Sequence, residues 1–192
     1  MCIRDSGTAV SRELYLGKYE VREITAPHGM VLNPEPHCVE LVYAGQNVAV
    51  TETATSFENE RQKVEISLVK SIEQNERFGI GTNGEMKNIS FGLFAAEEIV
   101  SASGTSIPAN GLVEIISLNE DGTAKIKTDL PFGSYYVQEL ATDSHYKLSD
   151  TKYPVTFGYA SQDTAVVKIA VNGGNAVENK LIYGCLLYTS PS

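Results

Sequence analysis

Apolar and polar residues alternate over several short stretches of this chain, and such alternation predicts β-strands with one face toward a core. In the stretch 63–70, Val64, Ile66 and Leu68 share one face, and Lys70 extends that apolar row. Turn residues such as Gly, Pro and Asn recur at short intervals between these stretches. Many short strands separated by turns are typical of a β-sandwich, so we expect an all-β fold.

Other stretches fit the same interpretation. We expect strands over 88–95, 112–118, 123–128, 167–170 and 176–181. Residues 107–111 are expected to form a turn, and 119–122 and 171–175 to form hairpin turns. The stretch 95–99, Ala-Ala-Glu-Glu-Ile, favours a short helical turn.

Two sequence motifs occur twice in the chain. Gly17-Lys-Tyr-Glu-Val-Arg-Glu23 returns as Gly133-Ser-Tyr-Tyr-Val-Gln-Glu139, and Tyr43-Ala-Gly-Gln46 returns as Tyr159-Ala-Ser-Gln162. Both pairs are 116 positions apart, which is a normal size for one domain. Two motifs with one offset predict two copies of the same domain.

The two ends of the chain resemble translated adapter DNA. Residues 1–6, Met-Cys-Ile-Arg-Asp-Ser, and residues 185–192, Cys-Leu-Leu-Tyr-Thr-Ser-Pro-Ser, match the translation of transposon-adapter sequences, so we expect both to be non-native. We then expect residues 7–62 to be the C-terminal part of a truncated domain and residues 63–184 to be a complete domain. Only Cys38 remains inside these limits, which excludes an intrachain disulfide there.

Three polar residues interrupt otherwise apolar rows on three different predicted strands. Lys70 follows Val64, Ile66 and Leu68; Glu139 shares a face with Tyr135 and Val137; and Asn179 shares a face with Val177 and Leu181. Burying a charge costs several kcal/mol per ion unless the charge is paired or neutralised. We therefore expect these three groups to meet inside the core.

Buried in this way, the three groups have a specific chemistry available. Burial favours a neutral lysine amine, which is a nucleophile, and a protonated glutamic acid, which donates hydrogen bonds. Our hypothesis is that Lys70 Nζ attacks the Asn179 side-chain carbonyl carbon while Glu139 polarises that carbonyl and shuttles protons. Ammonia leaves, and an intramolecular isopeptide bond forms. The alternative from the residues alone is a buried Lys–Glu ion pair beside a hydrogen-bonded Asn.

The motif Gly17-x-Tyr-x-Val-x-Glu23-x-x-Ala-Pro-x-Gly29 resembles the signature of Cna B-type domains, the SpaA-like modules of Gram-positive pilins and adhesins. The second copy is similar to them through 130–139, Phe91-Gly-Leu-Phe94 and Glu178-Asn179. The resemblance implies Greek-key, prealbumin-like (Ig-like) β-sandwich repeats. It also implies that a Lys, a Glu and an Asn form a spontaneous isopeptide bond, at Lys70, Glu139 and Asn179.

Two departures from that pattern are visible. The second copy has Ala141-Thr-Asp-Ser144 where the family often has Ala-Pro, and the first copy has Met30 where an aromatic residue is common. We expect these changes to affect a loop and a packing position, and to leave the three site residues untouched. The first copy keeps Glu23 and Asn59, but no lysine precedes Lys18, which faces outward. We therefore predict an incomplete site and no cross-link at Asn59.

Charge and composition exclude some classes of protein. The net charge of −9 argues against nucleic-acid binding, and no apolar run approaches the length of a membrane span. We expect no cofactor and no metal: the acidic turn 119–122 lacks calcium-loop spacing, and His28, His37 and His145 are not spaced as ligands or catalytic groups.

The sequence thus predicts a structural stalk repeat of a surface protein, not a turnover enzyme. The resemblance implies an extracellular location, attached to the cell wall of a Gram-positive bacterium. The expected partners are neighbouring repeats of the same chain, together with host or matrix ligands bound by other parts of the parent protein. The alternative is a ligand-binding adhesin module that uses its loops and has no cross-link. A pilin polymerised by a sortase needs a motif lysine and a sorting signal, and neither is visible.

Overall fold

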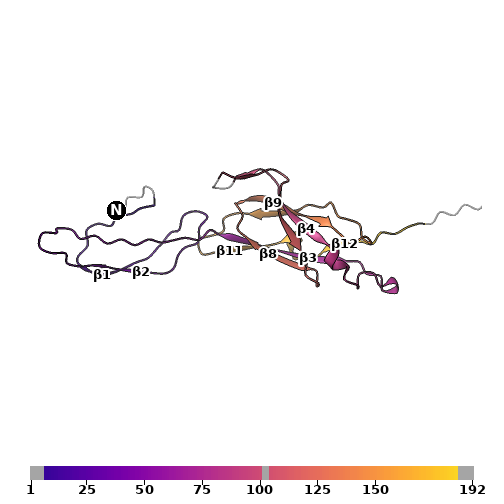
Figure 1. The fold of residues 1–192 in the computed structure, drawn as a ribbon, viewed down its shortest axis with the longest axis horizontal. Coiled ribbons are helices and arrows are strands. Elements are labelled where there is room, and N and C mark those ends of the chain that lie inside the picture. The colour runs from indigo at the N-terminus through magenta and orange to yellow at the C-terminus, as the bar shows by residue number, and fades with distance from the viewer. Residues whose placement is uncertain (1–6, 101–103, 186–192) are drawn as a thin grey trace, which may run out of the picture.

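The computed structural model describes residues 7–100 and 104–185. The expected adapter-derived ends lie outside these residues, apart from Cys185, which is exposed. The molecule is elongated: strands β1 and β2 lie in one half and the remaining strands form the other (Figure 1). Among the described residues, no helix has the length and hydropathy needed to cross a membrane.

The described chain is almost entirely strand and loop, which confirms the all-β prediction. Three short 3-10 helices interrupt it: η1 (Glu76–Phe78), η2 (Glu85–Asn88) and η3 (Val171–Gly174). The strands are β1 (Gly17–Val21), β2 (His37–Leu41), β3 (Lys63–Ile72), β4 (Ser90–Ala95), β5 (Ile99–Val100), β6 (Ser106–Ile107), β7 (Leu112–Ser117), β8 (Thr123–Thr128), β9 (Gly133–Ala141), β10 (Tyr153–Phe157), β11 (Val166–Ala170) and β12 (Val177–Asn179).

Two four-stranded sheets face each other in the larger half of the molecule. One has the order β10-β9-β4-β7, with antiparallel pairing throughout. In the other, β8 pairs antiparallel along one edge of β3, while β11 and β12 pair parallel along its other edge. The long strand β3 therefore lies beside β12, the last strand of the described residues.

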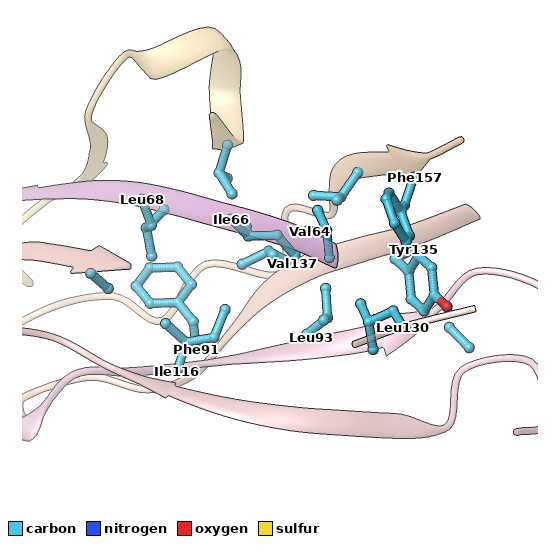
Figure 2. Packing of buried hydrophobic residues seen from close by; sticks show 14 of the residues in the cluster. Val64, Ile66, Leu68, Phe91, Leu93, Ile116, Leu130, Tyr135, Val137 and Phe157 are labelled. Carbon is cyan, nitrogen blue, oxygen red and sulfur yellow. The ribbon is translucent and has the colours of Figure 1, made fainter. Parts of the chain in front are cut away.

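The core fills the space between the two sheets (Figure 2). Val64, Ile66 and Leu68 point inward from β3, as the alternation predicts, and meet Phe91 on β4 and Val137 on β9. All five side chains are at most 2% exposed. Deep burial of branched and aromatic side chains from both sheets is what holds such a sandwich together.

Both expected hairpin turns, 119–122 and 171–175, are wrong. Residues 119–122 do form a turn, with Gly122 N donating to Asn119 O at 3.0 Å. However, β7 before it pairs with β4 and β8 after it pairs with β3, so the turn carries the chain from one sheet to the other. Residues 171–175 do not reverse the chain either, because β11 and β12 both run parallel to β3. In η3, Asn172 and Gly173 take left-handed conformations (φ 54° and 62°), after which the chain continues along β3 in the same direction.

The expected helical turn over 95–99 is also wrong. Ala95 N donates to Gly111 O at 3.0 Å, and Ala96 N donates to Ser134 O at 2.9 Å. Neighbouring strands thus take up the backbone groups that a helical turn would use, and tertiary pairing overrides the helix propensity of the alanines.

The smaller half contains the β1–β2 pair, joined in antiparallel register from Gly17↔Leu41 to Val21↔His37. The inward row that the sequence predicts, Tyr19 and Val21, is half-buried here. Only one sheet is present in this half of the described chain, so nothing covers that face completely.

A buried glutamine joins the two halves. Gln62, which is 1% exposed, lies immediately before β3. Its Nε2 donates to Ser161 O (3.0 Å) and Thr164 O (2.7 Å), and its Oε1 accepts from Ala160 N (3.0 Å). All hydrogen-bonding positions of the primary amide except one acceptor site are therefore used, which fixes the connection to the loop 159–164.

The repeated Tyr-x-x-Gln motif of the second copy lies in that same loop. Gln162 Oε1 accepts from Ala26 N at 3.0 Å, and Gln162 O accepts from Leu32 N at 2.8 Å. The ring of Tyr159 lies 4.5 Å from that of His28, centroid to centroid. The loop of the second copy thus holds the loop that follows β1 in the first.

Candidate functional site

The site lies where β3 and β12 run side by side, under the opposite sheet. The parallel register places Lys70 opposite Val177 and Asn179 opposite Ile72. Glu139 comes from β9 in the facing sheet and points toward them. The three polar residues that we expected to meet in the core do so. They are almost fully buried: Lys70 is 3% exposed, Glu139 4% and Asn179 2%.

The lysine is paired only loosely with the carboxylate. Lys70 Nζ lies 3.8 Å from Glu139 Oε1. It donates hydrogen bonds to two backbone oxygens, Val177 O at 3.0 Å and Ser71 O at 3.1 Å. These two carbonyls hold the amine at the junction of β3 and β12, with its carboxylate partner beyond ordinary hydrogen-bond length.

The asparagine amide is held through its nitrogen. Asn179 Nδ2 donates to both oxygens of Glu139, at 2.8 and 2.9 Å, and to Thr142 Oγ1 at 2.9 Å. Asn179 Oδ1 is buried and has no hydrogen-bond partner among the described residues. An unpartnered buried carbonyl is unusual and costs about 1–3 kcal/mol. The carbonyl that would be attacked is therefore the one polar atom of this amide without a partner.

The glutamate is fixed from its other side. Ser149 N donates to Glu139 Oε2 at 2.8 Å. The carboxylate thus contacts the amide nitrogen of Asn179, a backbone N–H and, at longer range, the Lys70 amine. Moving a proton between the two nitrogens through this carboxylate requires the Lys70 amine to approach within hydrogen-bond length, and polarising the carbonyl requires the Asn179 amide to turn over.

Burial sets the charge state of the lysine. Loss of solvent lowers the pKa of Lys70 from its ordinary value to about 8, and the charges of Glu139 and Glu178 oppose this shift. At pH 7 about a tenth of the amine is therefore in its neutral, nucleophilic form, a fraction that an ordinary exposed lysine reaches only at about pH 9.4.

The lowered pKa of Lys70 predicts a pH dependence of stability in a chain that cannot cross-link. In Asn179→Ala, the folded state loses the lysine proton near pH 8, whereas the unfolded state keeps it to about pH 10.4. The unfolded state therefore binds more protons in this window, and the free energy of unfolding should rise with pH, by at most about 1.4 kcal/mol per pH unit. Below about pH 8 both states are protonated and the rise should vanish.

Urea unfolding of Asn179→Ala between about pH 7 and 9.5 measures this effect. The matched control is Lys70→Met/Asn179→Ala, which lacks the titrating amine and should show no rise in that window. Equal profiles for the two variants would show that the pKa of Lys70 is not lowered.

The first copy contains the same arrangement without the lysine. Asn59 Nδ2 donates to Glu23 Oε2 at 2.6 Å, and Asn33 N donates to that same oxygen at 2.8 Å. Asn33 is 116 positions before Ser149, so the offset of the sequence repeat also relates the hydrogen bonds of the two sites. Asn59 Nδ2 also donates to Val31 O at 2.9 Å. The structure brings Glu23 and Asn59 together, with Lys18 exposed on the opposite face of β1.

One expectation about the site is wrong. The departure at 141–144 does affect the site, because the Thr142 hydroxyl contacts Asn179. Thr142 lies just after β9, where the two-residue period of the strand no longer predicts orientation. The only sequence signal for Thr142 is its difference from the first copy: the offset of 116 aligns Thr142 with Ala26.

The histidines make separate contacts. His28 lies against Tyr159, His37 in β2 stacks on Phe57, and His145 pairs with Asp143. In the part of the chain that the structure describes, no three His, Cys, Asp or Glu side chains are grouped so that they could hold a metal ion.

Comparison with known proteins agrees with this fold. The family model described as the SpaA prealbumin-like fold domain matches residues 4–56 and 60–175. No curated protein matches the chain. Among solved structures, the Bacillus anthracis TIE protein is 22% identical, with a TM-score of 0.51 over 88% of this chain.

Two further similar structures are pilins. The minor pilin GBS52 of Streptococcus agalactiae is 16% identical over 95% of this chain and 67% of its own (TM-score 0.40). BcpA, the major pilin subunit of Bacillus cereus, is 20% identical over 62% of this chain and 29% of its own (TM-score 0.33). The chain spans 26% of the TIE protein.

Proposed function

Because the chain belongs to the SpaA family of prealbumin-like fold domains, we propose that it is a structural stalk segment of a Gram-positive surface protein, adhesin or pilin-like, attached to the cell wall. The observation that carries this proposal is the buried contact of Lys70, Glu139 and Asn179 between the first and last strands of the sandwich. The proposal includes a single self-cross-linking reaction and no turnover of a substrate.

The reaction joins Lys70 to Asn179. Glu139 takes one proton from the Lys70 ammonium, and the neutral Nζ attacks the Asn179 carbonyl carbon. Glu139 then gives its proton to Nδ2, the Cγ–Nδ2 bond breaks, and ammonia leaves. Of the three amine protons, one stays on the new amide, one leaves in ammonia and one passes to solvent. The 3.8 Å and 2.8 Å contacts of Glu139 with the two nitrogens support this route. Fixed proximity of this kind can supply about 7–11 kcal/mol of the barrier.

We propose that residues 63–184 form one complete repeat and that residues 7–62 belong to the C-terminal part of the repeat before it. The hydrogen bonds of Gln62 and Gln162 support a stiff joint between them. Tension along such a stalk enters the second repeat through β3 and leaves through β12. A Lys70–Asn179 bond joins those two strands, so the load passes from one to the other without stretching the sheets.

Intact mass under denaturing conditions tests the cross-link. We expect the wild-type chain to be lighter than its sequence by one ammonia, and Lys70→Ala and Glu139→Ala to have their full masses. Lys63→Ala is the matched control: it removes a half-exposed lysine from the same strand and should leave the ammonia deficit unchanged.

Peptide mapping completes the test. A single conjugate between Lys70 and Asn179 is expected, and none at Asn59. A full mass in the wild-type chain would leave a buried ion pair and would make a ligand-binding adhesin module the better interpretation.

A further inference from the structure

The amide of Asn179 has a second anchor besides Glu139. Thr142 Oγ1 accepts from Asn179 Nδ2 at 2.9 Å. An amide nitrogen has two hydrogens, so one is shared between the two Glu139 oxygens and the other is directed to the threonine. Together they fix the plane of the amide and leave Oδ1 on the side without a partner.

The loop that carries Thr142 is itself attached to the end of the last strand. Lys147 N donates to Lys180 O at 3.1 Å, and Ile182 N donates to His145 O at 2.8 Å. Tyr146 N closes a turn on Asp143 O at 2.9 Å. These backbone bonds attach the loop to the residues just after β12 and so keep the threonine hydroxyl close to Asn179.

The first copy fills the same role with a different group. Position 142 corresponds to Ala26 there, which has no hydroxyl. The second Nδ2 hydrogen of Asn59 goes to the backbone oxygen of Val31 at 2.9 Å. In both copies, therefore, the amide nitrogen has an acceptor besides the glutamate, although the acceptor differs.

We propose that Thr142 is a positioning residue for the cross-linking of Lys70 to Asn179, an inference that rests on the proposed function. Its hydroxyl holds the departing nitrogen of Asn179, which prevents rotation of the amide and keeps the carbonyl carbon presented to the amine. Nucleophilic attack on a carbonyl carbon requires one face of the amide plane to meet the amine, and that orientation contributes directly to the rate.

The rate of ammonia loss tests this role. Full-length chain is made by cell-free synthesis, quenched in acid and denaturant at intervals, and weighed. Thr142→Val keeps the shape and removes the hydroxyl, and we expect it to slow cross-linking by about tenfold, the equivalent of one oriented hydrogen bond. Thr142→Ser keeps the hydroxyl and should restore a rate close to that of the wild type. Equal rates for Thr142→Val and the wild type would overturn the proposal, as would a Thr142→Ser chain as slow as Thr142→Val.

A second measurement does not depend on bond formation. In Lys70→Met, which cannot cross-link, the two side-chain N–H signals of Asn179 should exchange slowly with solvent. Adding Thr142→Val should speed exchange of one of them by about tenfold, because that hydrogen loses its acceptor. Unchanged exchange in the double variant would overturn the positioning role. A wild-type chain of full mass would instead refute the cross-link, and the exchange measurement would still decide whether Thr142 holds the amide.

Discussion

Pulled from its two ends in a single-molecule experiment, the chain should never release the length between Lys70 and Asn179. The proposed bond would close a loop of 109 positions, and force applied at β3 would then pass directly to β12. In Lys70→Met the loop is open, and unfolding of the sandwich should add roughly 380 Å of extension at ~3.5 Å per residue. The difference in extension between the wild type and Lys70→Met is large because an intact covalent bond prevents any extension of the loop.

The same substitution elsewhere on β3 provides the control. Lys63→Met changes a half-exposed side chain, so the cross-link and the missing extension should both be retained. A full 380 Å event in wild-type molecules would contradict the stalk mechanism, and roughly the same extension in Lys63→Met would show that any substitution on this strand weakens it. Without force, closing a loop of this length should add about 5 kcal/mol to the free energy of unfolding.

The three residues of the proposed cross-link could be predicted from the sequence because all three lie within strands. The two-residue period fixes which face each side chain takes, and that was enough to place Lys70, Glu139 and Asn179 in the core. Their separation along the chain did not matter, because a sandwich has only one interior.

The connections could not be predicted in the same way. The alternation along 112–118 and 123–128 predicts which side chains of each strand point inward, but not which strand it pairs with. These two strands lie in different sheets. Likewise, the turn at 171–175 contains Asn and Gly, which suit a hairpin, yet the flanking strands run in one direction along β3. Partner choice depends on packing between segments distant in sequence, which local turn chemistry does not contain.

Groups that act from loops escaped the sequence analysis for a related reason. Thr142 and the backbone N–H of Ser149 both contact site residues. Neither lies in a strand, so the two-residue alternation does not predict where these groups point. Comparison of the two copies contained a usable signal for Thr142, since Ala26 takes its place in the first. From sequence alone this difference indicates only a changed loop, because only the structure shows that the loop runs back to Asn179.

Glu139→Ala should be less stable than Lys70→Met, although neither variant can form the bond. Lys70→Met removes the buried charge and fills its space with an apolar side chain. Glu139→Ala leaves the lysine at 3% exposure without its carboxylate and takes both glutamate acceptors from Asn179 Nδ2. Breaking a buried pair by removing one partner costs about 3–5 kcal/mol, so the gap between the variants at pH 7 should be of that order.

Two further measurements identify the cause of that gap. Lys70→Met/Glu139→Leu removes both charged groups and should recover most of the difference, because no unpaired ion is left in the core. Raising the pH to about 9.5 should also narrow the gap, since the buried amine of Glu139→Ala then loses its proton and with it the cost of burial. A gap that persists at high pH and in the double variant would mean that Glu139 acts through packing or through its bond to Ser149 N. The charge of Lys70 would then have little part in stability.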